Sequence, residues 1–132
     1  MATHAFIRGW IHTGRDLSDQ VRAIIETSLA GSQEFGIDPE YAKELLVCWC
    51  FPATPAQDFV LVGATVGVAV LPLFKAQLTQ IAKEVVDVDG DDTYNICGRI
   101  EVSVDGEEAN QEWTISGGEL DTTARRPYFL SP

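Results

Sequence analysis

Apolar and polar residues alternate in two stretches of the chain, as they do in strands that bury one face. The first stretch, residues 6–12, places Ile7, Gly9 and Ile11 on one face and Phe6, Arg8, Trp10 and His12 on the other. The second, residues 99–104, turns Ile100, Val102 and Val104 to one side. Asp105-Gly106 then predicts a hairpin turn, with residues 112–116 as the returning strand and Gly117-Gly118 as the next turn.

Two other stretches have the spacing of amphipathic helices. Apolar residues recur at helical intervals from Leu17 to Leu29, with Asp16 or Ser18 as the N-cap and Gly31 as the stop. The second helix is expected to hold Phe74, Leu78, Ile81, Ala82 and Val85, with Pro72 in its first turn.

The middle of the chain is less regular. Residues 45–51 are rich in strand formers and apolar at successive positions, which predicts a central strand. The prolines in residues 52–55 predict a turn, and residues 59–63 the strand that returns from it. The place of residues 64–71 stays open, and residues 87–92 are expected to form an acidic loop.

The resulting order is β-α-β-β-α-β-β. Tightly connected strands with two helices between them favour an α+β fold in which both helices cover one face of an antiparallel sheet. We expect a ferredoxin-like sandwich with a C-terminal hairpin extension, formed by residues 1–132 as one domain.

Composition narrows the class of protein. The chain is 45% hydrophobic and 22% charged, which is ordinary for a globular domain. Its longest apolar stretch, residues 59–74, is interrupted by glycine, threonine and proline, and the N-terminus lacks a secretion-signal pattern, so a cytoplasmic location is expected. Cys48 and Cys50 would share one strand face and Cys97 stands alone, which favours reduced thiols that pack as small apolar groups.

The net charge of −11 is unevenly distributed. Residues 84–112 contain ten acidic residues and a single basic one, Arg99, a net of −9. Such a charge repels nucleic acid and anionic membranes and accelerates encounter with a basic protein. The sequence therefore predicts a protein partner, with no nucleic acid and no membrane.

Catalytic and metal-binding patterns are weak. Asp87, Asp89 and Asp91 match the first three ligand positions of an EF-hand loop, but Asp92 replaces the turn glycine and Gly98 the bidentate glutamate. Neither His4 nor His12 has a ligand at metal-binding spacing, and no phosphate-binding glycine loop is present. We expect no metal, no cofactor and no enzymatic activity.

The three tryptophans are candidates for different roles. Trp49, between two cysteines, is expected in the core. Trp10 and Trp113 lie on strands whose neighbours alternate, so each could be half-exposed and serve as an anchor in an interface, or could pack under the helices.

The N-terminal segment Phe6-Ile7-Arg8-Gly9-Trp10-Ile11 resembles the strand that begins one family of small α+β immunity proteins of bacterial polymorphic toxin systems. Small size and acidity agree with that resemblance. It implies a protein that binds and neutralises a cognate secreted toxin, often a nuclease, and Trp10 is the one position carried over from the family.

The leading hypothesis is thus a stoichiometric inhibitor whose acidic face binds a basic toxin. The residues expected to form that binding surface are Asp87, Asp89, Asp91, Asp92, Asp105, Glu107, Glu108, Glu112, Trp10 and Trp113. Two alternatives remain open: a ligand-binding protein or enzyme with a pocket near Cys48, Trp49, Cys50 and His12, and a structural or oligomeric accessory protein. The oligomeric state is not predicted.

Overall fold

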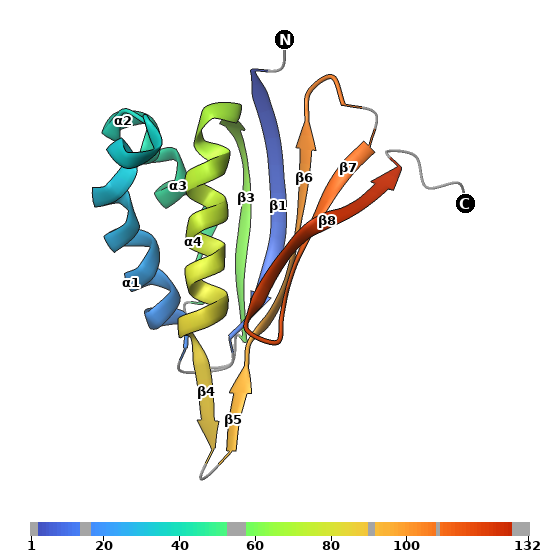
Figure 1. Ribbon diagram of the computed structural model, residues 1–132. Coiled ribbons are helices and arrows are strands. Elements are labelled where there is room, and N and C mark those ends of the chain that lie inside the picture. The colour runs from blue at the N-terminus through green and yellow to red at the C-terminus, as the bar shows by residue number, and fades with distance from the viewer. Residues whose placement is uncertain (1–2, 14–16, 53–57, 90–91, 108, 128–132) are drawn as a thin grey trace.

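The computed structural model describes residues 3–13, 17–52, 58–89, 92–107 and 109–127. Among these residues, six strands form one antiparallel sheet in the order β2-β3-β1-β6-β7-β8 (Figure 1). The strands are β1 (His4–His12), β2 (Trp49–Cys50), β3 (Phe59–Gly67), β6 (Cys97–Val104), β7 (Ala109–Ser116) and β8 (Glu119–Pro127). A separate hairpin, β4 (Val86–Asp89) and β5 (Asp92–Asn95), projects from the lower end of the molecule in Figure 1.

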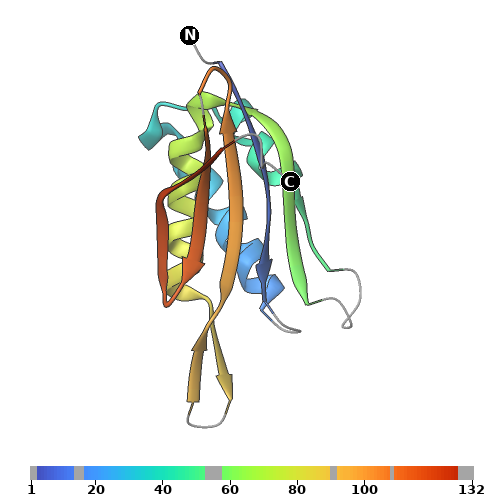
Figure 2. The same cartoon turned by 90° about the vertical axis from the view of Figure 1, so that its right-hand side faces the viewer.

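The helices lie on one side of the sheet. They are α1 (Ser18–Ser28), α2 (Pro39–Ala42), α3 (Glu44–Val47) and α4 (Leu71–Glu84), with 3₁₀ segments at Leu29–Phe35 and Val68–Val70. Figures 1 and 2 show α1 and α4 against the same face of the sheet, with β6, β1 and β3 in front of the helices in Figure 2. An α+β fold with helices on one face of an antiparallel sheet is therefore confirmed.

The core lies between this covered face and the two long helices. Ile7 and Ile11 of β1 are buried there, together with Val21 and Ile25 of α1. Phe74 of α4 is buried at the centre and packs against Trp49 and Trp113, with ring centroids 6.0 and 5.8 Å away. Full burial of one such side chain contributes about 1.5–3 kcal/mol, so this layer supplies most of the apolar stabilisation.

The predicted strand patterns are confirmed in β1, β6 and β7. Residues of β1 alternate between buried and exposed along the strand, and β6 buries Ile100, Val102 and Val104. The turn at 105–106 joins β6 to β7, and Gly117 and Gly118 take positive φ angles of 59° and 79° in the next turn. The second helix also has its predicted buried side, from Phe74 to Val85.

The prediction of a central strand over residues 45–51 is wrong. Residues 44–47 form α3, and β2 is a two-residue strand at the edge of the sheet. Ala42, Leu45 and Cys48 are buried at intervals of three, while Val47 is exposed. A short apolar run fits a helix turn as well as a strand, and here the helical spacing decides.

Three smaller predictions also need correction. Leu17 occupies the N-cap of α1 without a side-chain cap, Ser18 begins the helix, and Asp16 lies outside the described residues. The chain continues past Gly31 as a 3₁₀ segment and stops at Gly36, which has a φ of 70°. The described part of the acidic segment forms β4 and β5 rather than a loop. Residues 64–71, left open above, complete β3 and lead into α4.

Strands β1 and β6 approach each other closely at two glycines. A Cβ atom on Gly9 would lie 2.2 Å from the carbonyl oxygen of Arg99 and 2.7 Å from the Cα of Ile100. One on Gly98 would lie 2.8 Å from the carbonyl oxygen of Trp10. Backbone atoms cannot move aside as a flexible side chain can, so the pairing that aligns these two strands requires glycine at both positions.

Candidate protein-binding surface

The side of the sheet that faces away from the helices is called the open face. Cross-strand pairing fixes which side chains share it, because directly opposed residues point to the same side. It comprises Phe6, Arg8, Trp10 and His12 of β1, Phe59, Leu61, Gly63 and Thr65 of β3, Cys97, Arg99, Glu101 and Ser103 of β6, Asn110, Glu112 and Thr114 of β7, and Arg126 of β8. The described helices lie on the other side of the sheet (Figure 2).

One part of the open face is apolar and aromatic. Trp10 lies opposite Leu61, and His12 lies opposite Phe59. The Trp10 and Phe59 rings meet edge to face at 5.7 Å, and the His12 ring lies 4.9 Å from Phe59. Trp10, Phe59 and Leu61 are 37%, 47% and 50% exposed. We call Trp10, His12, Phe59 and Leu61 the aromatic patch.

The centre of the open face is a cluster of ions, the arginine–glutamate cluster, formed by Arg8, Arg99, Arg126, Glu101 and Glu112. Arg8 Nη2 donates to Glu101 Oε1 at 2.9 Å, and Asn110 Nδ2 donates to the same oxygen. Arg99 Nη2 and Arg126 Nε lie 2.5 and 3.5 Å from the two oxygens of Glu112. The register produces this cluster, because Arg8, Glu101 and Glu112 lie side by side on three successive strands.

The acidic residues do not form one face. Asp87, Asp89 and Asp92 belong to the β4–β5 hairpin, whereas Asp105 and Glu107 lie at the β6–β7 turn. Figures 1 and 2 show these two segments at opposite ends of the molecule. Strand β6 runs between them, and its length is about 3.3 Å per residue. Asp91 and Glu108 lie outside the described residues. The expectation of a single acidic face is therefore corrected to two acidic ends.

Two of the predicted contact residues have other roles. Trp113 is only 4% exposed, stacks on Phe74 in the core, and donates its indole N–H to Gln111 Oε1 at 3.1 Å. It is not available to a partner, because its position on β7 turns it to the covered face. Glu112 lies on the open face, but its carboxylate is engaged by two arginines. Trp10 alone of the predicted tryptophans is half-exposed.

Hydrogen bonds from within the chain occupy part of both edges of the sheet. At the β3 edge, the N–H of Gly63 donates to the carbonyl of Cys48, and that of Gly67 donates to Glu44 Oε2 at 3.3 Å. At the β8 edge, Arg125 Nη1 donates to the carbonyls of Thr122 and Ala124. Asp121 accepts from the hydroxyl and the N–H of Thr123, and these bonds hold the pKa of its carboxyl below the ordinary value. Such contacts oppose the addition of a further strand at these positions.

The three cysteines lie in different surroundings. Cys48 is buried, whereas Cys50 and Cys97 are exposed, so the expectation that Cys48 and Cys50 share one face is wrong. Burial raises the pKa of the Cys48 thiol to about 11, which keeps it protonated at neutral pH. Cys97 lies opposite His12 on the open face. Trp49 is buried in the core, as predicted.

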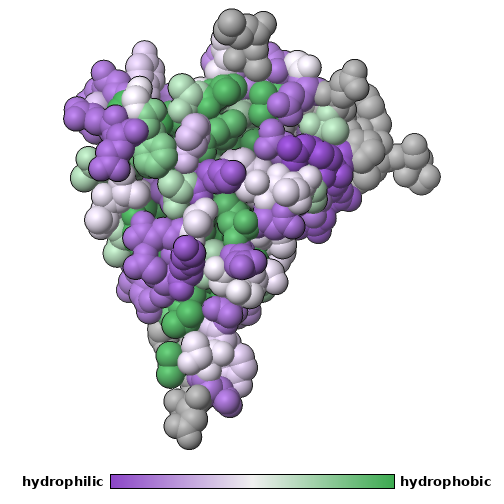
Figure 3. Space-filling view, in the orientation of Figure 1, coloured by the Kyte–Doolittle hydropathy of each residue, from purple (hydrophilic) through white to green (hydrophobic). Residues whose placement is uncertain are grey.

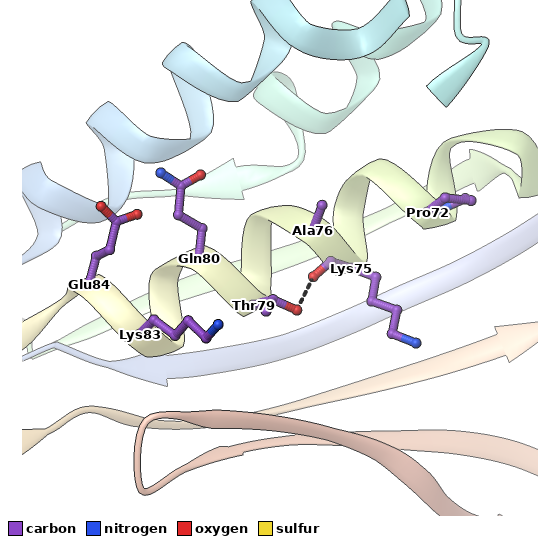
Figure 4. Close-up of a pocket in the computed structure, with 7 residues that line it drawn as sticks. All are labelled: Pro72, Lys75, Ala76, Thr79, Gln80, Lys83 and Glu84. Carbon is purple, nitrogen blue, oxygen red and sulfur yellow. Dashed lines mark hydrogen bonds between the residues drawn. The ribbon is translucent and has the colours of Figure 1, made fainter. Parts of the chain in front are cut away.

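Hollows elsewhere on the molecule are lined by other residues. One of about 680 Å³ lies between α2 and the end of β3, beside Tyr41, Glu44 and Thr65. Another, of about 530 Å³, runs along α4 past Lys75, Thr79 and Lys83, where the Thr79 hydroxyl donates to its own helix (Figure 4). The helix side carries hydrophilic side chains over much of its surface, with hydrophobic ones gathered near the upper end of α4 (Figure 3). None of these hollows contains Cys48, Trp49 or Cys50.

Metal-binding geometry is not found in the described part of the chain, where no group of three His, Cys, Asp or Glu side chains could hold an ion. The segment that resembles an EF-hand is partly a hairpin, and residues 90 and 91 lie outside the described ranges. No described helix is long and apolar enough to cross a bilayer.

Neither the family models, nor the curated proteins, nor the solved structures to which the chain was compared give a match. Sequence reasoning placed Trp10, Arg8 and His12 together but missed Phe59, Leu61, Arg99 and Arg126 as their neighbours. The signal that could have found them is the pairing register, which follows only once β1 is known to lie between β3 and β6.

Proposed function

We propose that this protein is a stoichiometric inhibitor that binds a partner protein through its open face and blocks that partner by contact. The observation that carries the proposal is the aromatic patch, in which Trp10 is held against Phe59 and beside Leu61 on an uncovered sheet face. Tryptophan and arginine dominate the energetic centres of protein interfaces, and here Trp10 lies next to Arg99 in the register.

The resemblance of residues 6–11 to an immunity-protein strand supports a bacterial toxin as that partner. Trp10, the residue carried over from the family, is also the centre of the aromatic patch. In this proposal the protein acts by binding alone, without a metal, a cofactor or a chemical step.

The two acidic ends have a separate role in the proposal. Exposed charges act over about 8 Å at physiological ionic strength, so they accelerate the approach of a basic partner without forming the contact. Buried aromatic contact on the open face then determines how slowly the complex dissociates.

For the fold, we propose a ferredoxin-like core extended at one side. The order β2-β3-β1-β6, antiparallel throughout, with α1 after β1 and α4 after β3, supports that proposal. Strands β7 and β8 would be the C-terminal extension. The extension is what widens the open face and adds Glu112 and Arg126 to it.

The function can be tested by affinity capture from the cell that produces the protein, followed by reconstitution. The wild type, Trp10→Ala and Tyr41→Ala are used in parallel. Tyr41 is a matched control, because it is an exposed aromatic residue on α2, outside the open face. We expect wild type and Tyr41→Ala to retain one protein that Trp10→Ala loses. The purified partner should lose its activity or toxicity when one equivalent of wild type is added.

Two outcomes would contradict the proposal. Equal retention by Trp10→Ala would remove the aromatic patch from the interface. A purified protein that forms dimers through the same patch, measured as a mass that rises with concentration and falls in Trp10→Ala, would make the open face a self-association surface instead.

A further inference from the structure

A hollow of about 350 Å³ lies on the open face where the aromatic patch meets the arginine–glutamate cluster. Trp10 forms one wall, and the opposite side is lined by Arg99, Arg126 and Glu112. The backbone of Gly9, between Arg8 and Trp10, also lies in its lining. The hollow is open to solvent and combines an apolar wall with charged groups.

The charges around this hollow do not cancel. Three arginines and two glutamates give the cluster a net charge of +1, in a chain whose net charge is −11. The signs are also layered. The two glutamate side chains are 16% and 22% exposed, whereas the arginines are 38–73% exposed. A group that approaches the hollow therefore meets guanidinium groups first, above carboxylates that are partly buried.

Within the arginine–glutamate cluster, guanidinium N–H donors outnumber the carboxylate oxygens that can accept from them. A guanidinium has five N–H donors and no acceptor. Among the described residues, Arg8 uses one of them on Glu101, and Arg99 and Arg126 each approach Glu112. The carboxylates in turn accept from two partners each, including Asn110 on Glu101. Spare donors of positive charge favour an acceptor of negative charge.

From this geometry we infer that the hollow binds a carboxylate, namely an aspartate or glutamate side chain that the partner protein inserts beside Trp10. The inference rests on the proposed function, since it names the chemical group that anchors the partner. One carboxylate would bring the charge of the cluster to zero, and the indole would cover the methylene groups of the entering side chain. The partner can still be basic overall, because the inference concerns a single anchoring residue.

The direct test uses two short, uncharged-ended peptides that differ only in a central glutamate or glutamine. Each is titrated into the wild-type protein at low salt, and binding is followed by NMR at the Trp10 indole N–H, assigned with Trp10→Phe. We expect the glutamate peptide to bind at least about fivefold more tightly, since it alone supplies a charged acceptor. Equal affinity for the two peptides would overturn the inference without any substitution in the protein.

Variants separate the charge effect from general damage. Arg126→Gln should reduce binding of the glutamate peptide to the level of the glutamine peptide. Arg125→Gln is the matched control on the same strand, because Arg125 donates to backbone carbonyls of β8, and it should leave binding unchanged. Glu112→Gln should strengthen binding several-fold, since it raises the charge of the cluster to +2. Weaker binding in Glu112→Gln, or equal losses in both arginine variants, would contradict the inference.

Inorganic phosphate serves as a competing probe. Displacement of the glutamate peptide by an equal concentration of phosphate would show a general anion site and would overturn the assignment to a side-chain carboxylate. If the peptides bind equally well but Trp10→Ala still loses the partner protein, the carboxylate anchor is wrong and the docking surface stands. If the glutamate peptide binds as expected but Trp10→Ala retains the partner, the proposed function is wrong.

Discussion

The covered and open faces of the sheet are formed by the same strands but carry different side chains. On β1, Ile7 and Ile11 are fully packed under the helices, while Phe6 and Trp10 remain exposed on the other side. Burial explains the first pair, because apolar area removed from water is what stabilises the fold. It does not explain the second pair. The exposed aromatic side chains of β1 are instead the feature on which the proposed binding surface depends.

The largest difference in stability should be between alanine substitutions at two neighbouring residues of β1, one on each face of the sheet. Ile7→Ala leaves a cavity in the buried core and should lower the free energy of unfolding by about 2–5 kcal/mol. Phe6→Ala removes a side chain that is mostly in water and should cost less than about 1 kcal/mol. Urea denaturation of both variants measures the difference. Equal losses would mean that the open face is also part of the stabilising core.

A second contrast uses two glycines on adjacent strands. Gly9→Ala forces a Cβ against backbone atoms of β6 and should destabilise by about 1–3 kcal/mol. Gly63→Ala on β3 is the matched control, because a Cβ there has no heavy atom within 4 Å, and it should be neutral to within about 0.5 kcal/mol. Thermal unfolding of the pair gives the answer. If Gly9→Ala is as stable as Gly63→Ala, the close approach of β1 and β6 is wrong.

The buried Cys48 and the exposed Cys97 should differ in their effect on the pH dependence of stability. The pKa of the buried Cys48 thiol is raised from 9.0 to about 11, so the folded state holds its proton over a range in which the unfolded state has lost it. The contribution of this thiol to the free energy of unfolding is fully present below pH 9. It falls by about 1–2 kcal/mol as the pH rises towards 11. Cys48→Ala should flatten this part of the profile, and Cys97→Ala, exposed on the open face, should not. Chemical denaturation at a series of pH values distinguishes them, and parallel profiles for all three proteins would refute the assignment.

The acidic ends are expected to affect the rate of association alone. Asp89→Lys with Asp92→Lys reverses charge at one end, and Asp105→Lys with Glu107→Lys does so at the other. The partner is proposed to be basic, so the pair of lysines at the acidic end that lies nearer to it should slow association by about tenfold at low salt. Added salt should remove this effect. Stopped-flow mixing at two ionic strengths measures this. Unchanged rates for both pairs would assign the acidic residues to solubility.

Much of the architecture could be predicted from the sequence because β1, β6 and α4 have clear periodicity. The alternation in residues 6–12 already placed Arg8, Trp10 and His12 on one face. Residues 45–51 were misassigned because an apolar run of that length has no distinguishing period, and burial of Ala42, Leu45 and Cys48 together selects the helix turn. Sheet order is not encoded locally, so the neighbours of Trp10 on β3 and β6 could not be identified from the sequence.

The prediction of a single acidic binding face was wrong because sheet order is not encoded locally. The acids from Asp87 to Glu112 are close in sequence, but β6 separates them into two ends, and the register instead surrounds Glu112 with Arg99 and Arg126. The fold therefore leaves a small cationic cluster on the open face of an acidic chain. That cluster can be recognised only from cross-strand pairs.

The most direct test of the account is the dissociation rate of the complex with the captured partner. Trp10→Ala should dissociate at least about tenfold faster than wild type, because a central aromatic anchor contributes about 2 kcal/mol or more. Tyr41→Ala should dissociate at the wild-type rate, since Tyr41 lies on α2 among the helices. An unchanged dissociation rate for Trp10→Ala, in a variant whose unfolding curve matches wild type, would contradict the claim that the open face is the binding surface.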